Sequence, residues 1–162
     1  MKIEEEVGKR LKERKLTISV AESCTGGLIQ KLITDISGSS EFFLGGVVAY
    51  SNLLKQKLLN VSPQTLITYG AVSDETACEM ARGIRELTGA DIGVSTTGIA
   101  GPTGGTPDKP VGLVYIGLCT QYHSKLVSES LTAHRFLFKG TRQEIREQTA
   151  NKALELVEKL KV

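Results

Sequence analysis

The stretch AESCTGG at residues 21–27 most constrains how this chain can fold. A β-branched segment at 16–20 precedes it, and apolar residues at helical spacing follow it over 28–36. The motif therefore occupies a turn from a strand into a helix, where unpaired N–H groups can hold a phosphate or an oxyanion. Its glycines allow a ligand to approach the backbone closely. A plainer alternative is that Ser23 or Thr25 only caps the helix.

Strands and helices alternate along most of the chain. Apolar spacing and capping signals predict helices over 3–14, 26–37, 53–59, 63–70, 73–89 and from Thr141 to about residue 160. Strands are predicted over 17–21, 45–50, 91–97, 111–120 and 126–131, with a turn near 121–124 between the last two. This order predicts a single domain over residues 1–162. Its expected fold class is α/β, a three-layer α/β/α sandwich around a mixed, mainly parallel sheet of about five strands.

Composition excludes several classes of protein. A formal net charge of +2 gives no bulk electrostatic reason to bind nucleic acid or an anionic membrane. No apolar run approaches the length of a membrane span, and the charged start of the chain is unlike a signal peptide, so a cytoplasmic location is expected. Three cysteines without a CxxC pair, and only two histidines, give no framework for a metal. We expect neither a metal nor a cofactor.

Three segments end predicted strands with polar or glycine-rich residues: 22–27, 50–55 and 97–110. In open α/β sheets, ligands bind outside the carboxyl ends of the strands, so these segments can share one cleft. The loop at 98–110 holds four of the 17 glycines and three of the four prolines. A loop of this length in a compact domain is usually functional, although it can also be a stiff surface excursion. It matches neither a Walker A motif nor a dinucleotide fingerprint.

Ser23 and Lys55 are candidates for a nucleophile and its base. A serine hydroxyl is a weak nucleophile alone, and a lysine in a partly dry site loses its proton readily enough to activate it. Tyr50 ends the strand predicted over 45–50, and Lys55 lies in the first turns of the helix that follows. Two alternatives remain: Cys24 as nucleophile, with a pKa lowered by the helix dipole, and His134 as base.

The motifs AESCTGG at 21–27, VVAYSNLLK at 47–55, GAVS at 70–73, TGIAGPTGG at 97–105 and KPVG at 109–112 together resemble the CinA C-terminal domain family. The resemblance covers nearly the whole chain in order, and the combination is specific although each motif alone is weak. Many members carry a further N-terminal domain similar to molybdopterin-binding folds. The motifs of this sequence match the C-terminal domain alone, so the stand-alone form is expected.

The resemblance implies hydrolysis of the carboxamide of nicotinamide mononucleotide to nicotinate mononucleotide and ammonia. It implies a metal-free serine–lysine mechanism with Ser23 as nucleophile, Lys55 as base and Tyr50 as hydrogen-bonding helper. Arg142 matches a basic position near the family's site, with a role on either the substrate phosphate or the charge of the intermediate. The residues expected to bind substrate are Cys24, Thr25, Gly26, Gly27, Asn52, Thr97, Gly98, Gly101, Gly104, Gly105 and Arg142.

The expected partners are a pyridine mononucleotide substrate and further copies of this chain. A homodimer or larger homo-oligomer is anticipated from the family, and apolar surface near 42–44 could serve it. The alternative function is a nucleotide-binding or regulatory module without catalysis. Such a module would use the same glycine-rich loop and would leave Lys55 with an ordinary pKa near ~10.4.

Overall fold

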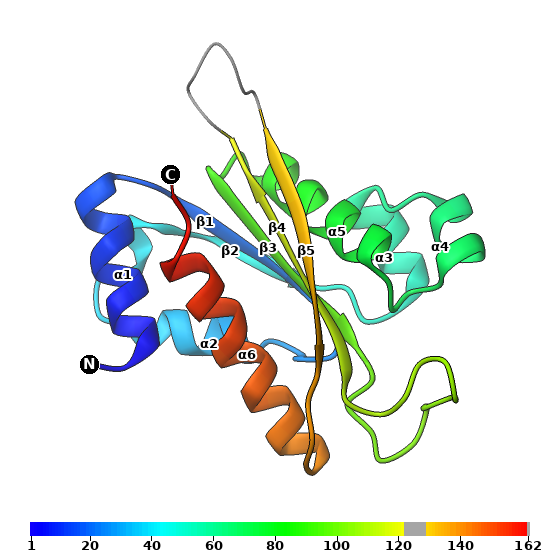
Figure 1. Cartoon of the computed structure of the whole chain (residues 1–162). Coiled ribbons are helices and arrows are strands. Elements are labelled where there is room, and N and C mark those ends of the chain that lie inside the picture. Colours follow the sequence, from blue (N-terminus) through cyan, green and yellow to red (C-terminus); the bar gives the residue numbers. More distant parts are fainter. Residues whose placement is uncertain (122–128, 162) are drawn as a thin grey trace.

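A five-stranded sheet forms the centre of the computed structural model, which describes residues 1–121 and 129–161 (Figure 1). The strands are β1 (Ile18–Glu22), β2 (Phe43–Val48), β3 (Ile92–Gly98), β4 (Leu113–Thr120) and β5 (Ser130–Leu137). They lie in the order β2-β1-β3-β4-β5. β1 runs parallel to β2 and β3, whereas β4 runs antiparallel to β3 and β5. The predicted mixed sheet of five strands is confirmed, but it is not mainly parallel, since two of its four pairings are parallel and two are antiparallel.

Two layers of helices enclose the sheet (Figure 1). One face carries α1 (Ile3–Arg14), α2 (Leu28–Thr34) and α6 (Arg142–Glu158), and the other carries α3 (Asn52–Leu59), α4 (Pro63–Tyr69) and α5 (Asp74–Thr88). A 3-10 turn, η1 (Ser39–Glu41), leads into β2. The predicted α/β/α sandwich is therefore confirmed. No helix in the described ranges is long and apolar enough to cross a membrane.

Each helical layer covers its own apolar core. On the first face, Val7, Ile29 and Ile145 belong to one cluster with the β1 and β3 residues Val20 and Val94. On the second face, the smaller cluster is built from α3, α5 and β1, and its buried members are Ala21, Ala49, Leu59, Val61, Met80 and Ile84. Both faces of β1 are thus buried, which explains why this strand carries an unbroken run of buried residues.

The parallel arrangement brings the carboxyl ends of β1, β2 and β3 to one edge of the sheet. The turn at 23–27 follows β1, Ala49 and Tyr50 follow β2, and the glycine-rich loop follows β3. The structure therefore brings together the three segments that the sequence indicated as candidates for one cleft.

Some element bounds differ from the prediction. α2 begins at Leu28 rather than residue 26, because Gly26 (φ 58°) and Gly27 (φ 99°) adopt left-handed conformations outside the helix, and it ends at Thr34 rather than residue 37. β2 begins at Phe43 rather than residue 45, and Phe42 is buried in the core while Leu44 is exposed. β5 extends to Leu137 because it pairs with β4 as far as Leu113. The predicted start of this strand at 126, and positions 122–124 of the predicted turn, lie outside the described residues.

Candidate functional site

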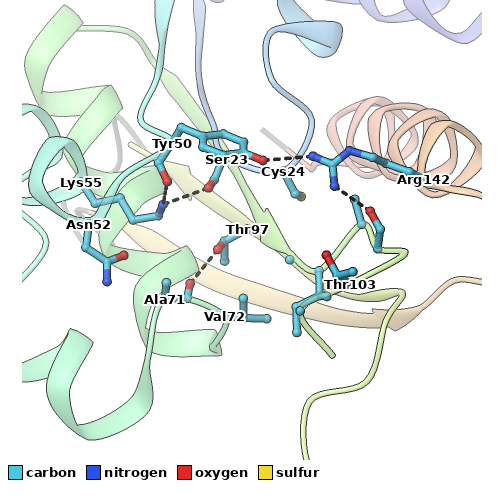
Figure 2. Close-up of a pocket in the computed structure, with 15 residues that line it drawn as sticks. Ser23, Cys24, Tyr50, Asn52, Lys55, Ala71, Val72, Thr97, Thr103 and Arg142 are labelled. Atoms are coloured by element: carbon cyan, nitrogen blue, oxygen red, sulfur yellow. Dashed lines mark hydrogen bonds between the residues drawn. The ribbon is translucent and has the colours of Figure 1, made fainter. Parts of the chain in front are cut away.

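A buried contact joins Ser23 to Lys55 at the carboxyl end of the sheet (Figure 2). Ser23 directly follows β1, and its N–H donates to the carbonyl of Thr96 on β3 at 3.0 Å, which extends the strand pairing by one residue. Lys55 lies in the first turns of α3, whose start is capped by the Ser51 hydroxyl. The Lys55 side chain is 1% exposed, and its Nζ lies 2.9 Å from Ser23 Oγ.

The partners of the Lys55 amine are all uncharged. Besides Ser23, it donates to the carbonyls of Ala49 (2.9 Å) and Tyr50 (3.2 Å), and none of the ion pairs among the described residues includes it. Burial lowers the pKa of Lys55 to about 8. A neutral amine has two N–H donors and one lone pair. With both N–H groups on the carbonyls, the lone pair is left for the Ser23 hydroxyl proton.

Cys24 does not have the properties of a rival nucleophile. Burial raises the pKa of its thiol to about 12, so the expected lowering by a helix dipole is wrong. The thiol stays protonated near neutral pH. The rival base, His134, lies in β5 opposite Ile116, with its Nε2 near the Thr132 hydroxyl, and it is absent from the cavity lining.

Arg142 and Tyr50 form a second polar group at the cavity rim. Arg142 is the first residue of α6, directly after the capping residue Thr141. Its guanidinium donates to the Tyr50 hydroxyl at 3.0 Å and to the carbonyl of Gly101 at 2.7 Å (Figure 2). The Tyr50 hydroxyl is thus bonded to Arg142, while the Tyr50 carbonyl contacts Lys55. A proton relay through the Tyr50 hydroxyl gains no support from these contacts.

Both polar groups open into one cavity of about 280 Å³ (Figure 2). Ten residues that the sequence indicated line it: Ser23, Cys24, Tyr50, Asn52, Lys55, Thr97, Gly98, Gly101, Gly104 and Arg142. Five further lining residues were not among the individually expected site residues, although three of them belong to the indicated loop at 98–110: Ala71, Val72, Ile99, Ala100 and Thr103. The first two belong to the GAVS segment, and a bond from the Thr97 hydroxyl to the carbonyl of Ala71 (2.6 Å) holds that segment against β3.

Four residues expected to bind substrate lie outside this lining: Thr25, Gly26, Gly27 and Gly105. The hydroxyl of Thr25 is buried against that of Thr96 at 2.7 Å. The start of α2 is also unavailable as an oxyanion site, because the Glu22 carboxylate accepts its N–H groups. This corrects the sequence-based expectation for the helix start. In the part of the chain that the structure describes, no group of three or more His, Cys, Asp or Glu side chains is arranged to hold a metal ion.

Comparisons with known proteins agree on one family. The family model for the CinA C-terminal domain matches residues 1–161. A Thermoanaerobacter pseudethanolicus protein, named among competence-damage inducible proteins, is 54% identical over 96% of this chain and 36% of its own length. A "CinA-like protein" of a Thermotoga species is 50% identical over 98% of this chain and 37% of its own length. This chain therefore spans little more than a third of the curated relatives it matches.

A solved structure covers nearly the same extent as this chain. The competence/damage inducible protein CihA from Agrobacterium tumefaciens superposes with a TM-score of 0.87 at 40% identity, covering 96% of this chain and 93% of that one. Competence damage-inducible protein A from Klebsiella pneumoniae gives a TM-score of 0.88 at 32% identity, covering 97% and 94%. The fold described above is thus the fold of these proteins.

Proposed function

Because this chain belongs to the CinA C-terminal domain family, we propose that it hydrolyses the carboxamide of nicotinamide mononucleotide to nicotinate mononucleotide and ammonia. The observation that carries the proposed chemistry is the buried 2.9 Å contact between Lys55 Nζ and Ser23 Oγ. The choice of substrate rests on the resemblance of the motifs at 21–27, 47–55 and 97–105 to nicotinamide-nucleotide amidases of this family.

Ser23 is the nucleophile and Lys55 the base in this proposal. Neutral Lys55 accepts the hydroxyl proton as Ser23 Oγ attacks the amide carbon. The resulting ammonium then donates that proton to the departing amine, so ammonia leaves and an acyl ester remains on Ser23. Lys55, neutral again, takes a proton from the water that attacks the ester and returns it to Ser23 Oγ as the ester bond breaks, which releases nicotinate mononucleotide and restores the serine hydroxyl. Burial supports this cycle, since it keeps the pKa of Lys55 at about 8, within reach of both protonation states.

The oxyanion of the tetrahedral intermediate needs hydrogen-bond donors near Ser23. The α2 start cannot supply them, because Glu22 occupies it. No backbone carbonyl among the described residues accepts the N–H of Cys24, and Cys24 lines the cavity. We assign the oxyanion to this N–H group, which follows the nucleophile as in other serine hydrolases.

Arg142 is the group we assign to the substrate phosphate. It lines the same cavity as Ser23, and it forms none of the ion pairs found among the described residues. Its guanidinium currently donates to two neutral oxygens, which a phosphate can replace with stronger, charge-assisted bonds. Ala71, Val72 and Ile99 give the cavity an apolar side suited to the pyridine ring.

The test is ammonia release from nicotinamide mononucleotide, with EDTA present, by the native chain and three variants. Ser23→Ala and Lys55→Met should each abolish turnover while the protein stays folded. Lys57→Met is the matched control, since Lys57 is an exposed lysine two residues further along α3, and it should behave as native. Ammonia release by Ser23→Ala would exclude Ser23 as the nucleophile. Tight binding of the nucleotide without turnover by the native chain would instead favour the non-catalytic module.

A further inference from the structure

Glu22 is a fully buried carboxylate directly before the nucleophile. It is 0% exposed and is the last residue of β1. Its Oε2 accepts the N–H groups of Gly27 (3.1 Å) and Ile29 (3.2 Å), and its Oε1 accepts that of Gln30 (2.9 Å). One side chain thus joins the end of β1 to the first turn of α2. The segment between these two fixed points is the turn 23–27 that carries Ser23.

The surroundings of Glu22 indicate that its charge is balanced by the helix start. No Lys, Arg or His of the described residues forms an ion pair with it. Burying an unpaired carboxylate is costly unless hydrogen bonds replace its water. Three backbone N–H groups and the positive end of the α2 dipole supply that replacement. The carboxylate thereby ties these three N–H groups to the end of β1.

The turn is held partly by its own backbone. Gly26 and Gly27 adopt positive φ values, and the N–H groups of Gly26 and Leu28 donate to the carbonyls of Ser23 (3.1 Å) and Thr25 (3.2 Å). Other contacts reach the turn: Ser23 N–H to the carbonyl of Thr96, the Thr25 hydroxyl to Thr96, and Arg146 to the carbonyl of Thr25. These contacts hold the start and the middle of the turn, whereas Glu22 holds its end at Gly27.

We propose that Glu22 is a positioning residue for the Ser23 nucleophile, holding the turn 23–27 at the register in which Ser23 Oγ meets Lys55 Nζ and the N–H of Cys24 meets the oxyanion. This inference rests on the proposed serine chemistry, but it does not depend on the identity of the amide. Glu22 acts through the backbone of the turn and touches no reacting atom.

Glu22→Gln and Glu22→Ala are the informative variants. The glutamine oxygen can still accept from Gly27 and Ile29, but its amide group points a donor at the N–H of Gln30. Alanine removes all three bonds. Asp91→Asn is the matched control, because the half-buried Asp91 carboxylate accepts the N–H of Thr17 at 2.8 Å at the opposite end of β1.

Two readouts are measured for each variant: kcat and KM for nicotinamide mononucleotide, and the rate at which phenylmethanesulfonyl fluoride sulfonylates Ser23, followed by mass spectrometry. In the second reaction, Ser23 Oγ bonds to sulfur, fluoride leaves, and Lys55 takes the hydroxyl proton.

Misplacing a reacting group by about 1 Å can lower a reaction rate about 100-fold. We therefore expect both kcat and the sulfonylation rate to fall about 10-fold in Glu22→Gln and about 100-fold in Glu22→Ala. KM should stay within twofold, and Asp91→Asn should match the native rates. Thermal unfolding checks that each variant is folded. If Glu22→Ala does not fold, the result for Glu22→Gln alone tests the inference.

Each outcome bears on the inference. Native-like sulfonylation of a folded Glu22→Gln variant overturns it, as does a loss confined to KM. If the native chain is sulfonylated at Ser23 but releases no ammonia from the nucleotide, the proposed substrate fails and the sulfonylation rates alone decide the role of Glu22. If native Ser23 does not react at all, there is no activated nucleophile to position, and both ideas are overturned.

Discussion

Lys55 and Arg142 line the same cavity, but the protein surrounds them differently. Lys55 is 1% exposed and contacts only a hydroxyl and two carbonyls, whereas Arg142 is exposed at the rim. Burial lowers the pKa of the lysine to about 8, which makes a neutral amine accessible. A guanidinium keeps its charge under all ordinary conditions, so Arg142 stays a cation. One cavity therefore holds an amine that can become neutral and a guanidinium that stays charged.

The comparison shows that the protonation state of a basic side chain depends on its burial as well as on its residue type. The predictions below exchange or remove the two cations and their partners. They assume the proposed reaction and run from the largest expected effect to the smallest.

Lys55→Arg should lower kcat for ammonia release about 10³-fold, because a guanidinium cannot become the neutral base and general base catalysis is typically worth 10²–10⁴-fold. The measurement is steady-state turnover of nicotinamide mononucleotide, with thermal unfolding as a check on folding. Lys57→Arg on the exposed side of α3 is the control. Retention of a tenth of native turnover by Lys55→Arg would show that position 55 needs only a positive charge.

Arg142→Gln should raise KM for nicotinamide mononucleotide about 30-fold with little change in kcat, because a charged hydrogen bond to phosphate contributes about 2 kcal/mol. The comparison substrate is nicotinamide riboside, which lacks the phosphate. Its kcat/KM should be the same for the variant and the native chain. Equal losses on both substrates would move Arg142 from the phosphate to the charge of the intermediate.

The pH dependence of kcat/KM should follow the neutral form of Lys55. With a pKa of about 8, the neutral fraction is about one tenth at pH 7 and about nine tenths at pH 9, so activity should rise about 10-fold over that interval. The sign is fixed because the base must be deprotonated to accept the Ser23 proton. A profile that is flat between pH 7 and pH 9 would contradict a titrating Lys55.

Tyr50→Phe should have the smallest effect, a rise in KM of about threefold, because it removes one oxygen that orients Arg142 and leaves the Tyr50 carbonyl on Lys55. The same steady-state assay measures it, and the double variant with Arg142→Gln is the control. The double variant should be no worse than Arg142→Gln alone. A large fall in kcat for Tyr50→Phe would restore the tyrosine hydroxyl as a participant in proton transfer.

Most of the fold was predictable because it depends on local patterns. Apolar periodicity and the Ser73 and Thr141 caps identified α5 and α6, and the alternation of elements indicated the sandwich. The errors arose where tertiary contacts override local pattern. The positive φ angles of Gly26 and Gly27 shorten α2, and pairing along β4 extends β5. Neither can be read from hydrophobic spacing.

The site shows the same division. Ser23 and Lys55 were indicated by residue type and by their place after predicted strands, whereas Arg142 was indicated by the resemblance to the family, and all three line the cavity. Ala71 and Val72 were not expected in the site, because apolar residues in a loop do not by themselves indicate a function. In the structure, the hydrogen bond from the Thr97 hydroxyl to the Ala71 carbonyl holds them beside β3. Glu22 belongs to the motif at 21–27, but no sequence pattern indicated that its carboxylate accepts a hydrogen bond from Gln30 in α2.

The amino-acid sequence by itself determined the α/β class, the family and the three segments that form the cleft, because these depend on residue types and their order. The tertiary structure alone decided the protonation behaviour of the site. It buried Lys55 among neutral oxygens and buried the thiol of Cys24, which moves the pKa of the first down and that of the second up. It also placed the Glu22 carboxylate where it accepts the N–H groups at the start of α2. These outcomes depend on the loss of water around each group, and only the packed chain determines that loss.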